Sequence, residues 1–163
     1  MPSRTDNGDR DECVAAWRTL LLAQNAVLRA IDADLDRAGL IPLTSYDVLL
    51  ELNAAEGRRL RMQELAARTV LSRTRVSRLV DELAAQGLVS RERDPDDRRA
   101  WFAVLTPAGR AALRKAAPVY LAGIRRHFTD HLDPTERTQL TQMLDKVVEA
   151  HQRLTITPRK PGR

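Results

Sequence analysis

Cysteine is almost absent from the sequence, which has 163 residues and one thiol, Cys13. A single cysteine cannot form an intramolecular disulfide, and the residues around it do not have the spacing of zinc ligands. No stretch approaches the roughly 18 consecutive apolar residues of a membrane-spanning helix. Residues 1–10 are polar and include acids, unlike a secretory signal or a transit peptide. We therefore expect a cytoplasmic protein with no membrane partner.

The motifs that typify enzymes are also missing. The sequence has no arrangement that resembles a nucleophilic triad, a glycine-rich phosphate loop or a zinc-protease helix. His127 and His131 are four residues apart and could share a helix face with Asp130, but this spacing is common by chance. We predict that the protein is not an enzyme and holds no cofactor and no metal, with metal binding by the two histidines as the alternative.

Positive charge is concentrated after residue 57. Residues 1–57 contain five arginines and ten acids, whereas residues 58–99 contain eleven arginines and seven acids. Residues 100–163 contain eleven lysines and arginines against five acids. A basic surface suits binding to phosphates, because each neutralised phosphate releases condensed counterions. Alternatively, many of these arginines are merely solvated, so charge alone is weak support for a nucleic-acid partner.

A long helix is predicted over residues 11–37, which contain no glycine or proline. Its apolar residues recur at alternating spacings of three and four, with one polar interruption at Gln24. These residues, called the seam below, are Val14, Trp17, Leu21, Leu28, Ile31 and Leu35. A seam that is narrow and long favours packing against other long helices, which could include those of a second copy of the chain.

The middle of the chain predicts three short helices and a hairpin. Helices are expected over residues 44–56, with Thr44 as the cap, and over 62–68 and 72–86, with Gly87 as the stop. Residues 59–61 predict a brief strand, and residues 88–93 and 100–105 predict the two strands of a hairpin. Residues 94–97 are turn formers and would make the hairpin tip.

Two more helices are predicted in the last third of the chain. Thr106 followed by Pro107 starts a helix that runs toward Phe128. Asp133, Pro134 and Glu136 form a second start signal, and that helix continues to about residue 154. Residues 1–10 and 157–163 are expected to be disordered tails.

The helix over residues 72–86 is the best candidate for a DNA-reading element. At 100° per residue its apolar residues fall on one side, leaving polar residues and arginines on the other. The polar set consists of Ser72, Arg73, Thr74, Arg75, Ser77 and Arg78. Ser72 is a good cap for a helix N-terminus, which carries a positive dipole end. Arginine and hydroxyl groups can contact phosphates or base edges in a major groove. The alternative is a solvated helix face.

The predicted hairpin tip is rich in charge. An arginine on a narrow hairpin can enter the negative minor groove, provided that neighbouring acids pair internally with other arginines. Asp97 lies two residues before Arg99, which suggests such a pair. We therefore expect Asp97 to fix the geometry of the tip while Arg98 or Arg99 contacts DNA. A surface ion-pair cluster of little energetic value is the plainer interpretation.

Five motifs occur in a fixed order along the chain: Met62-x-Glu64-Leu65-Ala66, residues 71–83, Gly87-Leu88-Val89, Asp97-x-Arg99 and Leu105-Thr106-x-x-Gly109. With these motifs the sequence resembles the MarR family of winged-helix regulators over roughly residues 11–154. This resemblance implies a mainly α fold with a small β-hairpin, in which residues 44–105 form a winged helix-turn-helix. It also implies that residues 11–37 and 107–154 join two copies into a homodimer. The two recognition helices would then enter successive major grooves of a near-palindromic operator.

The resemblance further implies a repressor more often than an activator, with a small-molecule or oxidant signal that loosens DNA binding. The family places its effector pocket between the dimerisation helices and the DNA-binding lobe, where Trp17, Tyr46 and Tyr120 are candidate lining residues. Aromatic residues at helical spacing are more often part of the core. Cys13 is similar in position to the reactive cysteine of the peroxide-sensing branch, although an inert thiol is the better interpretation.

The function predicted from the sequence is a transcriptional regulator that binds double-stranded DNA and responds to a ligand. A winged-helix module that binds a partner protein and no longer reads DNA is the alternative.

Overall fold

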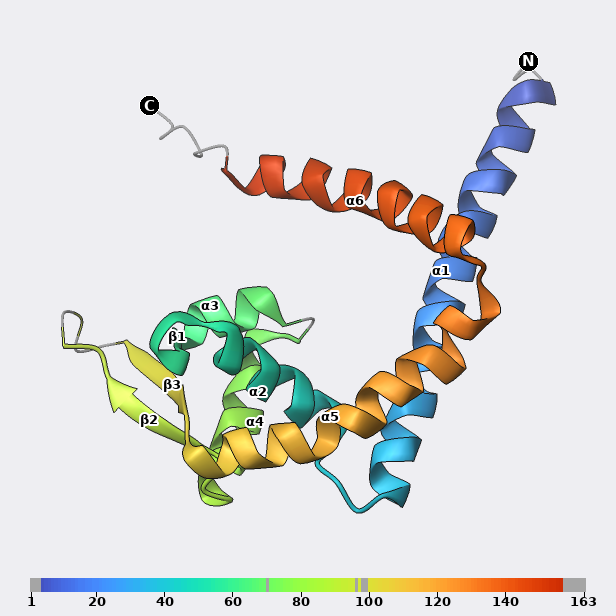
Figure 1. Ribbon diagram of the computed structural model, residues 1–163. Coiled ribbons are helices and arrows are strands. Elements are labelled where there is room, and N and C mark those ends of the chain that lie inside the picture. The colour runs from blue at the N-terminus through green and yellow to red at the C-terminus, as the bar shows by residue number, and fades with distance from the viewer. Residues whose placement is uncertain (1–3, 70, 96, 98–99, 157–163) are drawn as a thin grey trace, which may run out of the picture. The chain divides into compact units, whose positions relative to one another are not determined.

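The computed structural model describes residues 4–69, 71–95, 97 and 100–156. Residues 1–124 and 125–163 form two separate compact units (Figure 1). Among its described residues the first unit contains five α-helices, the 3-10 helix Glu56–Arg58 and a three-stranded sheet. The second contains the 3-10 helix Thr129–His131 and the last long helix. The mainly α fold with a small sheet that the sequence predicted is confirmed.

The first helix, α1 (Arg4–Arg37), is longer than the sequence predicted. It begins at Arg4, so residues 4–10 are helical and the prediction of a disordered tail over 1–10 is wrong for them. Residues 1–3 and 157–163, the rest of the expected tails, lie outside the described residues.

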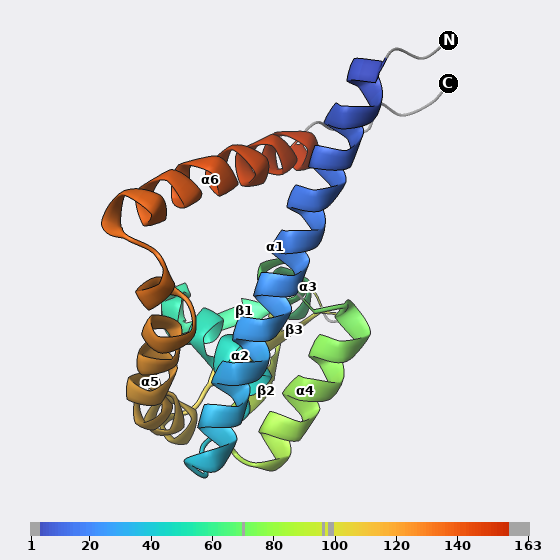
Figure 2. The same cartoon turned by 90° about the vertical axis from the view of Figure 1, so that its right-hand side faces the viewer.

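The second helix, α2 (Leu43–Ala54), forms the centre of the core, and α1 lies across it (Figure 2). Ile31 and Leu35, at the end of the seam on α1, are buried here. The predicted Thr44 cap is wrong, because Pro42 occupies the cap position and no side chain caps from there. Instead Asp32 of α1 accepts a hydrogen bond of 2.8 Å from the amide of Leu43. A long-range contact therefore replaces the local capping signal.

The sheet has three antiparallel strands in the order β1-β3-β2. These are β1 (Arg59–Arg61), β2 (Val89–Arg93) and β3 (Trp101–Leu105). The predicted hairpin is the β2-β3 pair, and the predicted brief strand β1 adds to the other edge of β3, where Leu60 opposes Ala103. Both of these residues are buried, so this side of the sheet faces the core.

Between β1 and β2 lie α3 (Met62–Arg68) and α4 (Arg73–Ala85). The hydroxyl of Ser72 accepts a hydrogen bond from the amide of Arg75 at 3.4 Å, so the predicted cap of α4 is confirmed. Gly87 has a φ of 72°, a left-handed conformation that glycine adopts without steric cost. This turn ends α4 and directs the chain into β2.

The fifth helix, α5 (Pro107–His127), packs against the turn that follows α4. The hydroxyl of Thr106 donates to the carbonyl oxygen of Gly87 at 2.8 Å and accepts from the amide of Gly109 at 3.0 Å. A Cβ at Gly109 would overlap the carbonyl oxygen of Leu88. The Leu-Thr-x-x-Gly motif thus has two roles. Its threonine caps α5, and its glycine lets the backbone of α5 approach the backbone of Leu88 closely.

The second unit contains α6 (Pro134–Ile156). Asp133 Oδ1 accepts from the amides of Thr135 and Glu136, and Glu136 Oε2 accepts from the amide of Asp133 at 2.8 Å. This reciprocal pair is a capping box, as the sequence predicted. It fixes the start of the last long helix.

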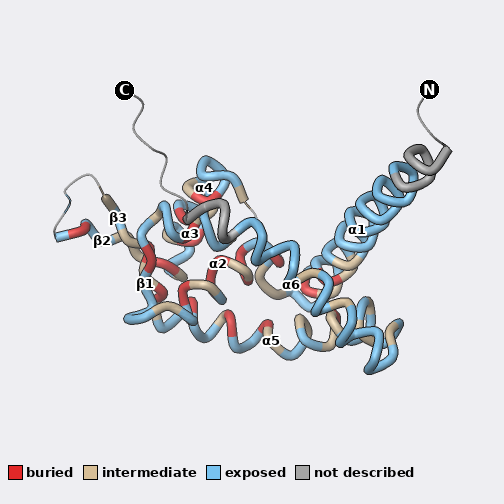
Figure 3. The backbone as a smooth tube through the Cα atoms, turned by 90° about the horizontal axis from the view of Figure 1, so that it is seen from above, coloured by how far each residue is buried: buried red, intermediate tan, exposed pale blue. Residues whose placement is uncertain are grey.

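Burial is uneven along the long helices (Figure 3). Ile31 and Leu35 of the seam are buried in the core, but Val14, Trp17, Leu21 and Leu28 are 58, 61, 43 and 43 % exposed. On α6, considered by itself, Met143, Val147 and Val148 are each more than half exposed. In the part of the chain that is described, no helix has the length and apolarity needed to cross a membrane.

Candidate nucleic-acid interface

Helix α4 presents a continuous polar face to solvent. Its buried side consists of Val76, Val80 and Leu83, which pack into the core. Of the polar residues singled out in the sequence, Ser77 is half-buried and the others are exposed: Ser72, Arg73, Thr74, Arg75 and Arg78. The structure therefore brings these six residues onto one accessible helix, with Ser72 as its cap. The helix dipole adds positive potential at the N-terminus of α4, where Ser72 lies.

Arg91 of β2 reaches across to this helix, and sequence reasoning missed it. Its Nη2 lies 2.8 Å from Oδ1 of Asp81 and donates to the hydroxyl and the backbone carbonyl of Ser77, both at 3.4 Å. The signal that could have found it is the period of two in the strand, which places Arg91 on the same side as buried Val89. Arg91 thus links the hairpin to the polar face of α4.

A second ion pair links the hairpin to the start of α3. Oδ2 of Asp94 lies 2.7 Å from Nη2 of Arg61, and Asp94 is 2 % exposed. Asp97, which the sequence suggested as the residue that fixes the tip, is exposed, and its carbonyl oxygen accepts from the amide of Ala100 at 2.9 Å. The predicted DNA contacts Arg98 and Arg99 lie outside the described residues. Asp94, which sequence reasoning did not single out, is therefore the buried acid of the hairpin.

An open hollow of about 580 Å³ lies between the hairpin, α3 and α4. It is lined by Arg61, Met62, Gln63, Arg73, Ser77, Arg91, Asp97, Ala100 and Trp101. Two of these arginines belong to the ion pairs described above, Arg61 with Asp94 and Arg91 with Asp81. The hollow therefore lies where both ion pairs join the hairpin to the helices.

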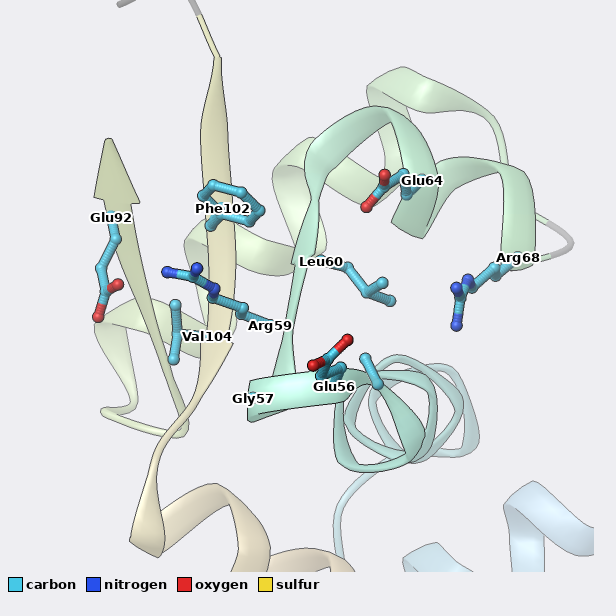
Figure 4. A pocket seen from close by; sticks show the side chains of 10 residues that line it. Glu56, Gly57, Arg59, Leu60, Glu64, Arg68, Glu92, Phe102 and Val104 are labelled. Atoms are coloured by element: carbon cyan, nitrogen blue, oxygen red, sulfur yellow. The ribbon is translucent and has the colours of Figure 1, made fainter. Parts of the chain in front are cut away.

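A cavity of about 790 Å³ opens beside β1 (Figure 4). At one side the guanidinium of Arg59 lies 4.7 Å from the ring centre of Phe102, within the range of a cation-π contact. At the other side Arg68, Glu56 and Glu64 border the hollow. The charges that line this cavity are of both signs, and none of its lining residues is predicted to contact DNA.

Comparison with known proteins gives the relationship. A sequence model of the MarR family matches residues 39–100. AbsC, a MarR family transcriptional regulator from Streptomyces coelicolor, is 37 % identical in sequence and superimposes with a TM-score of 0.77. That alignment covers 88 % of this chain and 95 % of AbsC. The chain belongs to the MarR family.

Other relatives are a MarR family structure and two transcriptional regulators. Sco3205 from the same organism, solved in complex with DNA, is 32 % identical with a TM-score of 0.77, and 91 % of each chain is covered. Among curated proteins, the regulator YkoM of Bacillus subtilis is 35 % identical over 86 residues, and the repressor MprA of Escherichia coli is 30 % identical over 105. The match covers 53 and 64 % of this chain, and it spans 55 and 59 % of the lengths of those two proteins.

Two of the three aromatic residues suggested by the MarR resemblance come together. The rings of Tyr46 and Tyr120 stack with centroids 4.3 Å apart at 29°. Burial, together with the neighbouring Tyr120 and Asp47, raises the pKa of Tyr46, and burial and Asp47 raise that of Tyr120. Burial, reinforced by Glu51, raises the pKa of Asp47 to about 6. Trp17, the third candidate, is 61 % exposed on α1.

The remaining candidates from the sequence are one cysteine and two histidines. Cys13 is exposed on α1. His127 ends α5, and His131 ends the short 3-10 helix Thr129–His131. Within the described residues, no three His, Cys, Asp or Glu side chains gather into a group able to hold a metal ion.

Proposed function

We propose that this MarR-family protein is a transcriptional regulator that reads double-stranded DNA with α4 and the β2-β3 hairpin. The observation that carries this proposal is the capped helix α4, whose six polar residues are accessible while its apolar side is buried. A recognition helix needs this combination, because it must be held rigidly by the core while its side chains reach base edges. Arginine at Arg73, Arg75 and Arg78 supplies charge for phosphate contacts and donors for guanine.

The regulator would act as a homodimer on a near-palindromic operator. Support comes from the seam of α1, whose first four apolar residues are 43 to 61 % exposed in a single chain. Apolar side chains recurring along one face of a long helix are costly to leave in water, and a second helix covers them. The exposed Met143, Val147 and Val148 make α6 a further candidate for this contact. A two-fold dimer presents two copies of α4 to two half-sites.

Repression and response to a small molecule form the finer part of the proposal. Two relatives, MprA of Escherichia coli and YetL of Bacillus subtilis, are named as transcriptional repressors. The stacked pair of Tyr46 and Tyr120, with Trp17 as a third candidate, would contribute aromatic surface to an effector site. An effector bound there would shift the population of conformations that present α4 to DNA.

The first experiment is fluorescence anisotropy on the DNA that flanks the protein's own coding region and on a scrambled duplex, across a salt series. We expect tight binding to the native duplex only, with an affinity that falls steeply as salt rises. Equally weak binding to both duplexes at physiological salt would favour the alternative of a protein-binding module, which a pull-down would then test.

Replacing Arg78 by Ala separates base reading from phosphate binding. If Arg78 contacts a base, the variant loses about 1–3 kcal/mol of binding free energy on the native duplex and discriminates less against the scrambled one. A uniform loss on all duplexes would make Arg78 a phosphate contact. Arg114→Ala is the matched control, because it removes one exposed arginine from α5 rather than from α4.

A further inference from the structure

The contact between Arg91 and α4 is more specific than a general attraction between charges. Nη2 of Arg91 approaches both the carboxylate of Asp81 and the hydroxyl of Ser77. The Nε–H group is buried and has no hydrogen-bond acceptor among the described residues. The contacts described for this guanidinium are those of Nη2 with α4, and they hold it against Ser77 and Asp81.

The contact with Ser77 acts on the hydroxyl group of this serine. A serine hydroxyl has one hydrogen and two lone pairs, and it rotates to suit its neighbours. Because a guanidinium can only donate, it occupies one lone pair and turns the hydroxyl hydrogen away from its own charge, and by polarising the oxygen it makes that hydrogen a stronger donor. Ser77 is half-buried and lines the hollow between α4 and the hairpin, so it borders the space that a base edge would enter.

The contact with Asp81 removes a second obstacle to DNA binding. Asp81 is exposed on α4, with 61 % of its side chain accessible, and a carboxylate there would repel phosphates. Arg91 lies 2.8 Å from it and balances the charge. An ion pair this exposed adds little to the stability of the fold. Its larger effect is on the electrostatic potential that a DNA phosphate meets near α4.

We propose that Arg91 is a positioning residue that makes Ser77 a hydrogen-bond donor toward a base edge in the major groove. This inference rests on the proposed DNA-reading function of α4. In the major groove, guanine N7 and O6, adenine N7 and thymine O4 accept hydrogen bonds, whereas the cytosine amino group only donates. One operator position in each half-site is therefore selected for an acceptor, and cytosine is disfavoured on the strand that faces Ser77.

The test is selection from a pool of random-sequence duplexes, carried out with the wild type and with four variants. Arg91→Met keeps the aliphatic stem but removes the donors, and Ser77→Ala removes the hydroxyl itself. We expect both variants to lose the preference at the same operator position, by roughly two- to tenfold in the ratio of acceptor bases to cytosine. A purely structural role for Arg91 would lower the melting temperature without changing base preference at one position.

Arg93→Ala is the matched control. Arg93 lies on the same strand and carries the same charge, but its guanidinium lies over the ring of Trp101 at 5.2 Å. We expect this variant to retain the preference that Arg91→Met loses. Arg91→Gln repeats the test in case Arg91→Met does not fold, because its shorter amide cannot extend to where Nη2 meets Ser77.

The outcomes separate this inference from the proposed function. If the wild type enriches no sequence, the DNA-reading function fails and the role of Arg91 fails with it. If the wild type enriches an operator and the folded Arg91 variants select the same base at every position, the role of Arg91 alone is overturned.

Discussion

Arg61 and Asp94 form an ion pair of 2.7 Å in which the two side chains differ greatly in burial. The Asp94 side chain is 1 % exposed, whereas that of Arg61 is 47 % exposed. Arg61 stands at the junction of β1 and α3, and Asp94 directly follows β2. The pair therefore connects the hairpin to the helix-turn-helix. Its loss costs more free energy at the buried carboxylate of Asp94 than at the exposed guanidinium of Arg61, which water can solvate.

Arg61→Ala is expected to lower the free energy of unfolding by about 1–3 kcal/mol, because a buried carboxylate loses a charged partner. Asp94→Asn should cost less, since Arg61 can return to solvent. Urea denaturation measures both. Arg59→Ala is the control, because the guanidinium groups of Arg59 and Arg61 both lie over the ring of Phe102, at 4.7 and 5.7 Å, but only Arg61 forms the ion pair with Asp94 described here. Equal costs for Arg61→Ala and Arg59→Ala would argue against the pair as a link.

Gly109→Ala is expected to destabilise the protein by about 1–3 kcal/mol, because the added Cβ must displace the backbone at Leu88. Ala108→Ser, at the exposed neighbouring position, should cost only about 0.5 kcal/mol. Thermal unfolding followed by circular dichroism compares the two. A Gly109→Ala variant as stable as the wild type would show that the backbone at Leu88 can shift without loss of stability.

Asp47 should make stability depend on pH. Its pKa is about 6 in the folded protein against an ordinary 3.8, so the folded state binds more protons between these values and stability falls as pH rises through that window. Asp47→Asn removes the penalty of ionisation. We expect the variant to unfold at a higher urea concentration than the wild type at neutral pH, with the difference vanishing toward pH ~4. Asp36→Asn, at an exposed position of α1, controls for the loss of one charge.

Trp17→Glu is expected to weaken the proposed dimer, because it places a charge on the exposed seam of α1. Sedimentation equilibrium should show a shift toward monomer. Thr19→Glu adds the same charge two residues further along α1. The helical period places residue 19 on a different face of the helix from the seam, so this variant should leave the dimer intact. A wild type that is monomeric at all concentrations tested would refute the dimer, and equal effects of both variants would refute the role of the seam.

The local signals in the sequence determined most of the secondary structure. Ser72, Gly87, Thr106 and Asp133 act within a few residues of their own position, so the helix boundaries they set could be read directly. The alternation of α4 between buried and polar residues likewise follows from the helical period, and it identified the candidate DNA-reading face. Membership of the MarR family could be recognised from the same motifs in their order.

Tertiary structure alone decided the partners of the charged residues. Asp32 caps α2 in place of Thr44, and Arg91 contacts Ser77 of α4. Each of these contacts joins positions more than ten residues apart, so local sequence signals do not predict them. Many arginines and acids in the sequence could pair, and composition does not say which ones do. The fold selects among them through strand register and burial, which bring Asp94 to Arg61 and set Tyr46 on Tyr120. Short-range chemistry thus specified the elements of this protein, and long-range packing specified how its polar side chains act on one another.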